Sequence, residues 1–402
     1  MSILFCIACS IILLCLIFKG KGGCSNIILA GFVLRVLMMI VDINHIFPVL
    51  HSGSDSEAFH EIALQNSVGY DNSLTHYTDF LTIIYTLFFD DHPRLVAQFI
   101  NIAFGVGILL IVRRCLLLCN VERRTKRVAM WVMALMPNFI IFSAILLREA
   151  WIEFFIALSL LFFVRWFLQK GIGLLDAALS IACVFAAAYM HAGAIATAVG
   201  YMIAFIIYRP SQKRVRFSFV SILFIAAAAA ATAIYAANLD LLGGKFADIE
   251  EFDEELIESG LSDLESRGNS AYLQWLDISS PAAGIAALPL RIFYFMFSPI
   301  PFDWRGVNDI AAFLFDSLIY LLMLIFCLRR KAVEPVMKHL RTFLLTALLL
   351  AATIFSVGTF TAGTAIRHRA KFLSIAVVAY AVGQTVKSRR TEDAERKKKL
   401  SK

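Results

Sequence analysis

The sequence predicts an all-α, polytopic membrane protein, a helical bundle of about eleven transmembrane helices with interfacial helices on its outer face. Of its 402 residues, 60% are hydrophobic and 17% are charged, and the mean hydropathy is +0.76. Soluble domains are about 45–50% apolar and about 25% charged. The apolar residues also fall in continuous blocks of about 20 residues, the length of helix that crosses a bilayer. These observations exclude a soluble enzyme, a disordered chain, a disulfide scaffold and a barrel of alternating strands.

The apolar blocks give the expected spans in chain order. The first is expected to be an uncleaved helix with its N-terminus outside, because Met1–Phe18 has no basic leader and no A-x-A cleavage site. The positive charges of Lys19 and Lys21 follow this block instead. The expected spans are residues 2–18, 26–47, 94–112, 128–147, 150–168, 174–190, 192–208, 217–236, 309–328, 342–360 and 372–386.

Lys and Arg in short loops orient these spans, because cytoplasmic loops are enriched in both residues. Six segments hold 27 of the 37 Lys and Arg residues: 19–22, 113–127, 165–170, 209–216, 329–341 and 387–402. All six lie on the cytoplasmic side only if Asp79–Phe89 does not cross the membrane, so we expect an interfacial or re-entrant helix there. The result is a multi-pass membrane protein, expected in the cell inner (cytoplasmic) membrane. The net charge of +7 is then explained by membrane lipid, and no nucleic-acid partner is expected.

One domain over 1–386 and a basic cytoplasmic tail over 387–402 follow from this topology. Two outer loops remain, at 48–93 and 237–308. In the first, Asp55–Gln65 is amphipathic and is expected to lie on the membrane surface. The second holds ten acidic residues between Asp240 and Glu265, which favour a solvated helical cap because they lack the order of an EF-hand. It ends in an aromatic, Pro-rich stretch, Leu288–Trp304, suited to the interface.

The eight cysteines and the histidines do not indicate a metal or a disulfide. Each cysteine lies in an apolar span or beside a basic loop. Cys6 and Cys9 form a C-x-x-C pattern, which fits a metal or redox role but fits small buried hydrophobic residues better. No disulfide, no metal site and no cofactor are therefore predicted.

Ten Lys and Arg residues depart from the cytoplasmic pattern. Arg35 lies within a span, and the other nine fall on the outer side, where they oppose the orientation bias. Burying such cations costs a few kcal/mol each, so an acidic partner or an anionic ligand should offset the cost. The nine are Arg94, Arg148, Lys245, Arg267, Arg291, Arg305, Arg367, Arg369 and Lys371.

Four polar clusters meet at this outer edge, as expected for a site between transmembrane helices. They are Gly53–His60, which includes Asp55; Arg148 with Glu149; His191 through Gly193; and Arg367-His368-Arg369-Ala370-Lys371.

Each cluster also fits a structural role. Asp55 suits a helix N-cap. Arg148 and Glu149 could pair with each other or cap helices, and His191 fits a hydrogen-bonded core position. The late cations fit contacts with lipid headgroups. Glu153, one turn after Glu149, is more suited to pairing with an arginine than to acting as a second acid.

The combined clusters suit transfer of a sugar from a lipid phosphate. Guanidinium groups match phosphate oxygens, and a carboxylate in a low-dielectric cleft suits a general base. The base would take the proton of an acceptor hydroxyl, while the cations stabilise the departing phosphate. The sequence contains no P-loop, G-x-S-x-G, H-E-x-x-H or Rossmann fingerprint.

At these residues the chain resembles the GT-C superfamily of polytopic glycosyltransferases, particularly family-39-like enzymes and polymerases of O-antigen or exopolysaccharide repeat units. The stretches that carry the resemblance are Phe32–Arg35 followed by Gly53–Phe59, Pro137–Glu149, Phe295–Trp304, and Arg367-His368-Arg369. Two positions depart from the pattern: Phe59 stands where Tyr is frequent, and Ala370 where Pro is frequent.

The resemblance implies that Asp55 is the base or an essential acid, and that Arg367 and Arg369 face lipid phosphate. We add Arg148 to the phosphate clamp and expect Glu149 to orient an arginine or the acceptor. Further candidates for sugar or phosphate contacts are His60, His191, His368 and Lys371.

The expected substrates are a polyprenyl-(di)phosphate-linked sugar donor and a glycan or lipid-linked acceptor. Other polysaccharide-assembly proteins are candidate partners, and a divalent cation is compatible but not indicated. The alternative function is a non-enzymatic transporter or flippase of lipid-linked sugars, which would need polar residues at mid-span on several helices.

Overall fold

The computed structural model describes residues 1–20, 23–46, 52–70, 72, 75–88, 92–216, 271–273, 275–276, 281–329 and 334–385. These residues are almost entirely helical, and their one sheet is a two-stranded hairpin of β1 (Tyr208–Arg209) and β2 (Arg214–Val215). Six of the described helices are long and apolar enough to cross a membrane. The prediction of an all-α membrane protein is therefore confirmed at this level.

The chain divides into two compact units, a finer division than the one domain that the sequence predicts. The first unit comprises Met1–Ile195, Leu322–Leu345 and Ala370–Lys402, and the second comprises Ala196–Leu321 and Thr346–Arg369. Helices α16 (Leu318–Arg329) and α17 (Pro335–Val357) each contribute residues to both.

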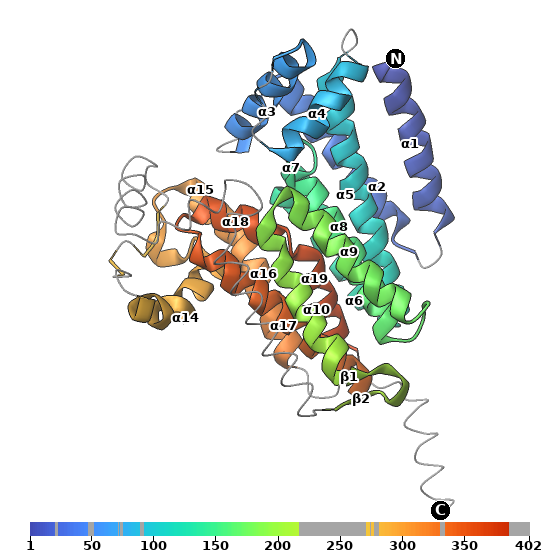
Figure 1. The fold of residues 1–402 in the computed structure, drawn as a ribbon, viewed down its shortest axis with the longest axis vertical. Helices are drawn as coiled ribbons and strands as arrows, with labels where there is room; N and C mark the ends of the chain where they lie inside the picture. Colours follow the sequence, from blue (N-terminus) through green and yellow to red (C-terminus); the bar gives the residue numbers. More distant parts are fainter. Residues whose placement is uncertain are drawn as a thin grey trace, which may run out of the picture. The chain divides into compact units, whose positions relative to one another are not determined.

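The first unit is built around α5 (Pro93–Leu118), its longest helix. Helices α1, α2, α4, α6, α8 and α19 all contact α5, and Figure 1 shows α1, α2 and α5 running side by side. Apart from α5, the helices of this unit are α1 (Ser2–Lys19), α2 (Ser25–Ile43), α3 (Ser52–Ser67), α4 (His76–Leu87), α6 (Arg123–Leu135), α7 (Pro137–Phe142), α8 (Glu149–Phe167), α9 (Leu174–Met190), the 3-10 turn Ala192–Ile195 and α19 (Leu373–Gly383).

Two glycines allow α2 and α5 to approach closely around the buried side chain of Arg35. A Cβ atom at Gly105 would lie 2.7 Å from Arg35 Nε and 2.8 Å from Ser143 Cβ. At Gly31 it would lie 2.9 Å from Leu109 Cδ1. Real Cβ atoms almost never come so close to other atoms. At Gly105 the contact includes Ser143 Cβ, so the tight packing requires glycine there, whereas at Gly31 the end of the Leu109 side chain can shift.

The second unit contains shorter helices and one wide turn. Helix α10 packs closely on α17, because a Cβ atom at Gly200 would lie 2.5 Å from Ala347 Cα. A π-helical turn, Phe313–Ser317, joins α15 to α16. Its other elements are α10 (Ala196–Ile207), the 3-10 turn Pro210–Gln212, α14 (Pro281–Phe297), the 3-10 turn Pro301–Asp303, α15 (Val307–Ala312) and α18 (Ala362–Ala370).

Most of the expected spans that fall on described residues correspond to helices, but one differs. The expected span 128–147 is not one helix: α6 ends at Leu135, α7 begins at Pro137, and a turn follows Phe142. The break lies where proline disfavours helical conformation in the preceding residue, Met136, and removes a backbone donor. The expected span 217–236, the acidic stretch Asp240–Glu265 and most of the tail lie outside the described residues.

The interfacial segments of the first outer loop are helices of the expected kind. Helix α3 covers the amphipathic stretch Asp55–Gln65. Helix α4 spans only 12 residues, about 18 Å, too short to cross the hydrocarbon layer. Thr75 and Thr78 form a capping box at its start, in which the backbone N–H of each donates to the hydroxyl oxygen of the other. The membrane placement of both helices stays a prediction.

Candidate functional site

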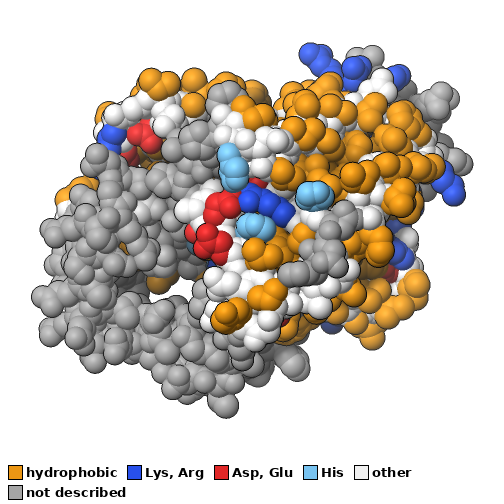
Figure 2. Space-filling model, turned by 90° about the horizontal axis from the view of Figure 1, so that it is seen from above, with side chains coloured by type: hydrophobic (Ala, Val, Ile, Leu, Met, Phe, Trp, Pro, Cys, Tyr) orange, Lys and Arg blue, Asp and Glu red, His pale blue; other side chains and the backbone are white. Residues whose placement is uncertain are grey.

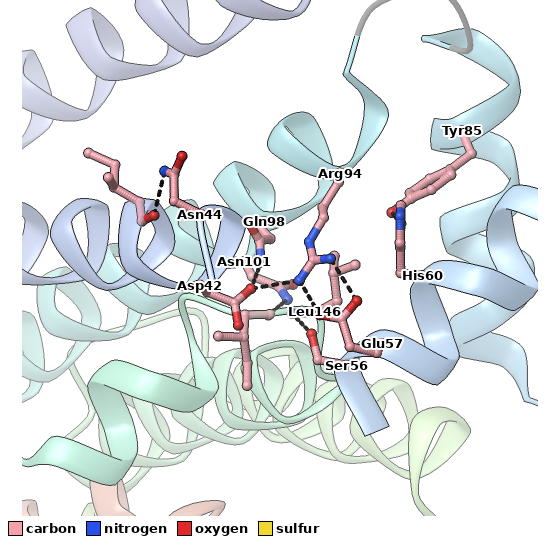
Figure 3. A network of polar contacts seen from close by, with 12 residues as sticks. Asp42, Asn44, Ser56, Glu57, His60, Tyr85, Arg94, Gln98, Asn101 and Leu146 are labelled. Carbon is pink, nitrogen blue, oxygen red and sulfur yellow. Dashed lines mark hydrogen bonds and ion pairs between the residues drawn. The ribbon is translucent and has the colours of Figure 1, made fainter. Parts of the chain in front are cut away.

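One guanidinium group links three helices at the C-terminal end of α2 (Figure 3). Arg94, in the first turn of α5, donates to Glu57 Oε2 at 2.9 Å and Glu57 Oε1 at 2.6 Å. It also donates to Asp42 Oδ2 at 2.9 Å. Asp42 is nearly buried, whereas the Glu57 side chain is 40% exposed. The group carries one positive and two negative charges, so the end of α2 and the starts of α3 and α5 meet in an acidic network.

A second layer of polar side chains connects this network to the turn before α8. Gln98, one turn after Arg94 in α5, donates to Asp42 Oδ2 at 2.5 Å. Asn101, one turn further along α5, donates to the Ile145 carbonyl at 2.7 Å and the Leu147 carbonyl at 3.2 Å. These bonds satisfy buried backbone groups of an irregular segment, which would otherwise be costly. The segment leads directly into Arg148 and Glu149.

Helix α3 also forms a hydrogen bond with the irregular segment before α8. The backbone N–H of Leu146 donates to Ser56 Oγ at 3.1 Å, and Ser56 is fully buried. Asp55 and Glu57 flank Ser56 in the chain, so this bond fixes the start of α3 against the turn that carries Arg148. The polar contacts therefore bring two of the four predicted clusters together within the first unit.

The environment shifts the pKa values of two side chains of α3. Hydrogen bonding to Arg94 lowers the pKa of the Glu57 carboxyl, so Glu57 stays ionised in the pair. Partial burial and the nearby Arg94 charge lower the pKa of His60, which favours neutral imidazole. His60 Nδ1 lies 2.6 Å from the hydroxyl oxygen of Tyr85, which is buried in α4.

Figure 2 shows acidic, basic and histidine side chains gathered among hydrophobic ones on the face seen from above.

A second ionic group lies at the start of α8. Glu149 is the first residue of the helix and is fully buried, and its Oε1 lies 3.9 Å from Nζ of Lys371. Lys371 is also buried. The position of Glu149 in the first turn of α8 is favourable, because a carboxylate there interacts well with the helix dipole.

Glu153 adds a second buried carboxylate one turn further into α8. It interacts electrostatically with Glu149, Arg35 and Lys371. Neither of its oxygens has a hydrogen-bond partner within the described part of the chain. The four residues Arg35, Glu149, Glu153 and Lys371 thus form a buried cluster of two acids and two bases. The expected pairing of Glu153 with an arginine stays a prediction, because Arg35 directs its hydrogen bonds to Ser143 and Gly31.

Arg35 is held from three directions in the interior of the first unit. Its Nε donates to Ser143 Oγ at 2.8 Å, and its Nη1 donates to the Gly31 carbonyl at 2.8 Å. The guanidinium carbon lies 4.5 Å from the centroid of the Phe139 ring, a cation–π geometry. Ser143 and Phe139 belong to the segment after the Pro137 break, so this arginine anchors the segment that the break creates.

The predicted site residues of the first unit occupy neighbouring elements. Asp55 is half-buried and lies in the first turn of α3, which begins at Ser52, so the N-cap alternative for Asp55 does not hold. Arg148 Nη1 lies 3.5 Å from the carbonyl oxygen of Met190, the residue before His191. His191 itself ends α9 in an extended conformation. The Arg148–Glu149 turn and the His191 turn therefore lie side by side.

The late arginines belong to α18 of the second unit, where Arg369 is fully committed to protein partners. It pairs with Asp316 and donates to Ser317 Oγ at 2.8 Å, to the Ser298 carbonyl at 2.7 Å and to the Phe295 carbonyl at 3.2 Å. The Arg369 and Asp316 side chains are both about 1% exposed.

The neighbours of Arg369 in α18 are less enclosed. Arg367 is half-buried. The ring of His368 lies 4.8 Å from that of Phe355. The phosphate role predicted for Arg367 and Arg369, and their proximity to Asp55, stay predictions.

Several residues of these networks were not selected from the sequence. Asp42 and Asp316 are single acids within or at the end of apolar blocks, and such isolated charges are the signal that could have identified them. Gln98 and Asn101 carry no comparable signal. Among the described residues, no group of three or more His, Cys, Asp or Glu side chains could hold a metal ion.

Comparisons with models of protein families, with curated proteins and with solved structures give no match to this chain.

Proposed function

We propose that the protein is a membrane glycosyltransferase or polysaccharide polymerase of GT-C type, with about eleven spans in the cytoplasmic membrane. It would transfer a sugar or oligosaccharide from a polyprenyl-(di)phosphate carrier to a hydroxyl acceptor at the outer face. The observation that carries this proposal is the connection of Asp55 to the Arg148–Glu149 turn through the bond between Ser56 Oγ and the Leu146 N–H.

The reaction requires one base and one stabilised leaving group. The acceptor oxygen attacks the anomeric carbon, and its proton passes to the Asp55 carboxylate. The bond between the anomeric carbon and the phosphate oxygen breaks, and the electron pair leaves with the phosphate. Arg148 would stabilise the charge that develops there, because guanidinium donors match phosphate oxygens. His191, beside Arg148, would add a hydrogen bond to phosphate or sugar.

The buried ionic cluster would position Arg148 at this site. Lys371 lies beside Glu149, and the pair would fix the start of α8 on which Arg148 is positioned. Glu149 and Lys371 are both buried, so their proposed role is to orient Arg148 rather than to meet the sugar.

The direct test is to incubate the purified protein with defined polyprenyl-linked sugars and to analyse the products by mass. A product heavier by one donor glycan, with release of the polyprenyl phosphate, is the expected result. The absence of product with every donor that the membrane contains would contradict the proposal.

Charged side chains buried within the candidate spans favour a second candidate function, the transport of lipid-linked sugars. Arg35 and Glu153 lie within α2 and α8, and Asp316 lies in the π-helical turn between α15 and α16. Ionisable residues at such positions often mark transport pathways. Protein in liposomes that moves a fluorescent lipid-linked sugar across the bilayer without forming a product would favour the transporter.

A further inference from the structure

A basic pocket borders the N-terminal end of α2, whereas the Arg94 network lies at its C-terminal end. It has a volume of about 350 Å³ and is lined by Gly23, Cys24, Ser25, Asn26, Ile27, Arg123, Lys126 and Arg127. The pocket thus lies between the first turn of α2 and the first two turns of α6. This volume is within the range of small-molecule sites, about 300–1,000 Å³.

The charge of the pocket is one-sided. Its lining residues include three cations and no carboxylate. Glu122, at the start of α6, is exposed and does not belong to the lining. Two helix N-termini add to the positive potential, and neither Cys24 nor Glu122 caps its helix through a side-chain hydrogen bond.

Lys126 is the most enclosed cation of the pocket. It is 7% exposed and lines the pocket. A lysine of this kind buries its aliphatic stem and keeps its ammonium in polar surroundings. Because the lining holds no carboxylate, an anion in the pocket would supply the counter-charge for Lys126 and its neighbouring arginines.

Arg113 does not line the pocket and is bound to the end of α1 instead. Its Nη1 donates to the carbonyl of Ile17 at the end of α1, at 3.1 Å. A Cβ atom at Gly20 would lie 1.8 Å from Arg113 Nη2, so glycine at this position makes room for the guanidinium. Arg113 thereby joins the end of α1 to α5.

We propose that this pocket binds a phosphate-bearing anion, with Lys126 and Arg127 as its main cationic contacts. The short basic loops place this end of α2 on the cytoplasmic side, where anionic lipid headgroups concentrate. The phosphate can come from such a headgroup or from a free anion in solution, and both sources offer the same oxygens to the pocket. The pocket and the proposed catalytic residues lie at opposite ends of α2, so the two proposals are independent.

The experiment measures binding to the full-length protein in detergent with two probes. Native mass spectrometry follows bound phosphatidylglycerol, with phosphatidylcholine for comparison, and calorimetry follows inorganic phosphate. The variants are Lys126→Met and Arg127→Gln. The matched control is Arg124→Gln, because Arg124 is exposed on the same helix and does not line the pocket.

We expect each pocket variant to bind about fivefold more weakly, the effect of about 1 kcal/mol per cation, and Arg124→Gln to bind like the unaltered protein. Binding of phosphatidylglycerol alone identifies a lipid headgroup, and binding of inorganic phosphate identifies a free anion. The proposal is overturned if neither probe binds, or if Arg124→Gln weakens binding as much as the pocket variants do. Arg127 is exposed, so Arg127→Gln keeps the test valid even if Lys126→Met fails to fold.

Discussion

Arg94 Nη2 lies 2.6 Å from Glu57 Oε1, and this ion pair joins the start of α5 to the second turn of α3. The same nitrogen lies 2.9 Å from Asp42 Oδ2 on α2. Helices α2, α3 and α5 thus share one cation. The predictions below concern this network, the buried cluster beneath it and the proposed base.

Replacing Arg94 should destabilise the first unit. Arg94→Met leaves the nearly buried Asp42 with an uncompensated charge, and removing one partner of a buried pair costs about 3–5 kcal/mol. Because Glu57 is partly exposed, we expect a smaller loss than this range, about 2–3 kcal/mol. Denaturant titration in detergent measures the loss, and the exposed Arg124→Gln should show none. Equal stability of Arg94→Met and Arg124→Gln would contradict the structural role of Arg94.

The Glu57 pair should make stability depend on pH in the acidic range. The pKa of Glu57 is lowered in the folded protein, so its contribution is present above the unfolded pKa and is lost as pH falls through the folded pKa. We expect the melting temperature of Glu57→Gln to fall less than that of the unaltered protein as pH decreases from 6 towards 3. The exposed Glu61→Gln should retain the original pH profile. Parallel profiles for all three proteins would contradict this prediction.

Glu149 and Lys371 should be coupled energetically. Glu149→Gln leaves Lys371 buried without its carboxylate, and Lys371→Met leaves Glu149 in the same state. Each single variant should therefore be destabilised by about 3 kcal/mol or more, and the double variant by less than the sum. A double-mutant cycle from denaturant titrations gives the coupling, and simple additivity would argue against the pair.

The proposed base gives the sharpest functional prediction. Asp55→Asn should abolish product formation, because an amide cannot accept the acceptor proton, while melting temperature and membrane insertion stay unchanged. Glu61→Gln is the matched control, as Glu61 lies on the same helix and is exposed. Activity of Asp55→Asn comparable to that of the control would remove Asp55 as the base.

Arg369 distinguishes a structural role from the phosphate role predicted from the sequence. Its donors are directed to Asp316, Ser317 and two carbonyls, so Arg369→Lys should lose several bonds and destabilise the protein by about 2–4 kcal/mol. If Arg369 instead contacts lipid phosphate, Arg369→Lys will keep the melting temperature and weaken only the apparent affinity for the polyprenyl-linked donor. Thermal melts and donor titrations of the same variant separate the two.

The sequence predicted the helical class, most spans and the turn at Arg148 because these depend on local hydropathy and on breaks between apolar blocks. The Pro137 break was visible as a single residue but was outweighed by the continuous apolar run around it. The pairing of Arg94 with Asp42 depends on two residues 52 positions apart, and hydropathy carries no information about which helix faces which. Asp316 and Arg369 are a similar case, since each is conspicuous alone and only the packing of the second unit brings them together.

The two glycines around Arg35 have a consequence for how this sequence can change over time. A methyl group at position 105 would strike both the guanidinium of Arg35 and the side chain of Ser143, and one at position 31 would strike Leu109. A larger residue at position 105 therefore becomes tolerable only after a shorter side chain replaces Arg35 or Ser143, whereas at position 31 a shift of the Leu109 side chain suffices. Positions 35, 105 and 143 should then vary as a set among relatives of this chain, and a substitution pattern in which they drift separately would show that this close contact is dispensable.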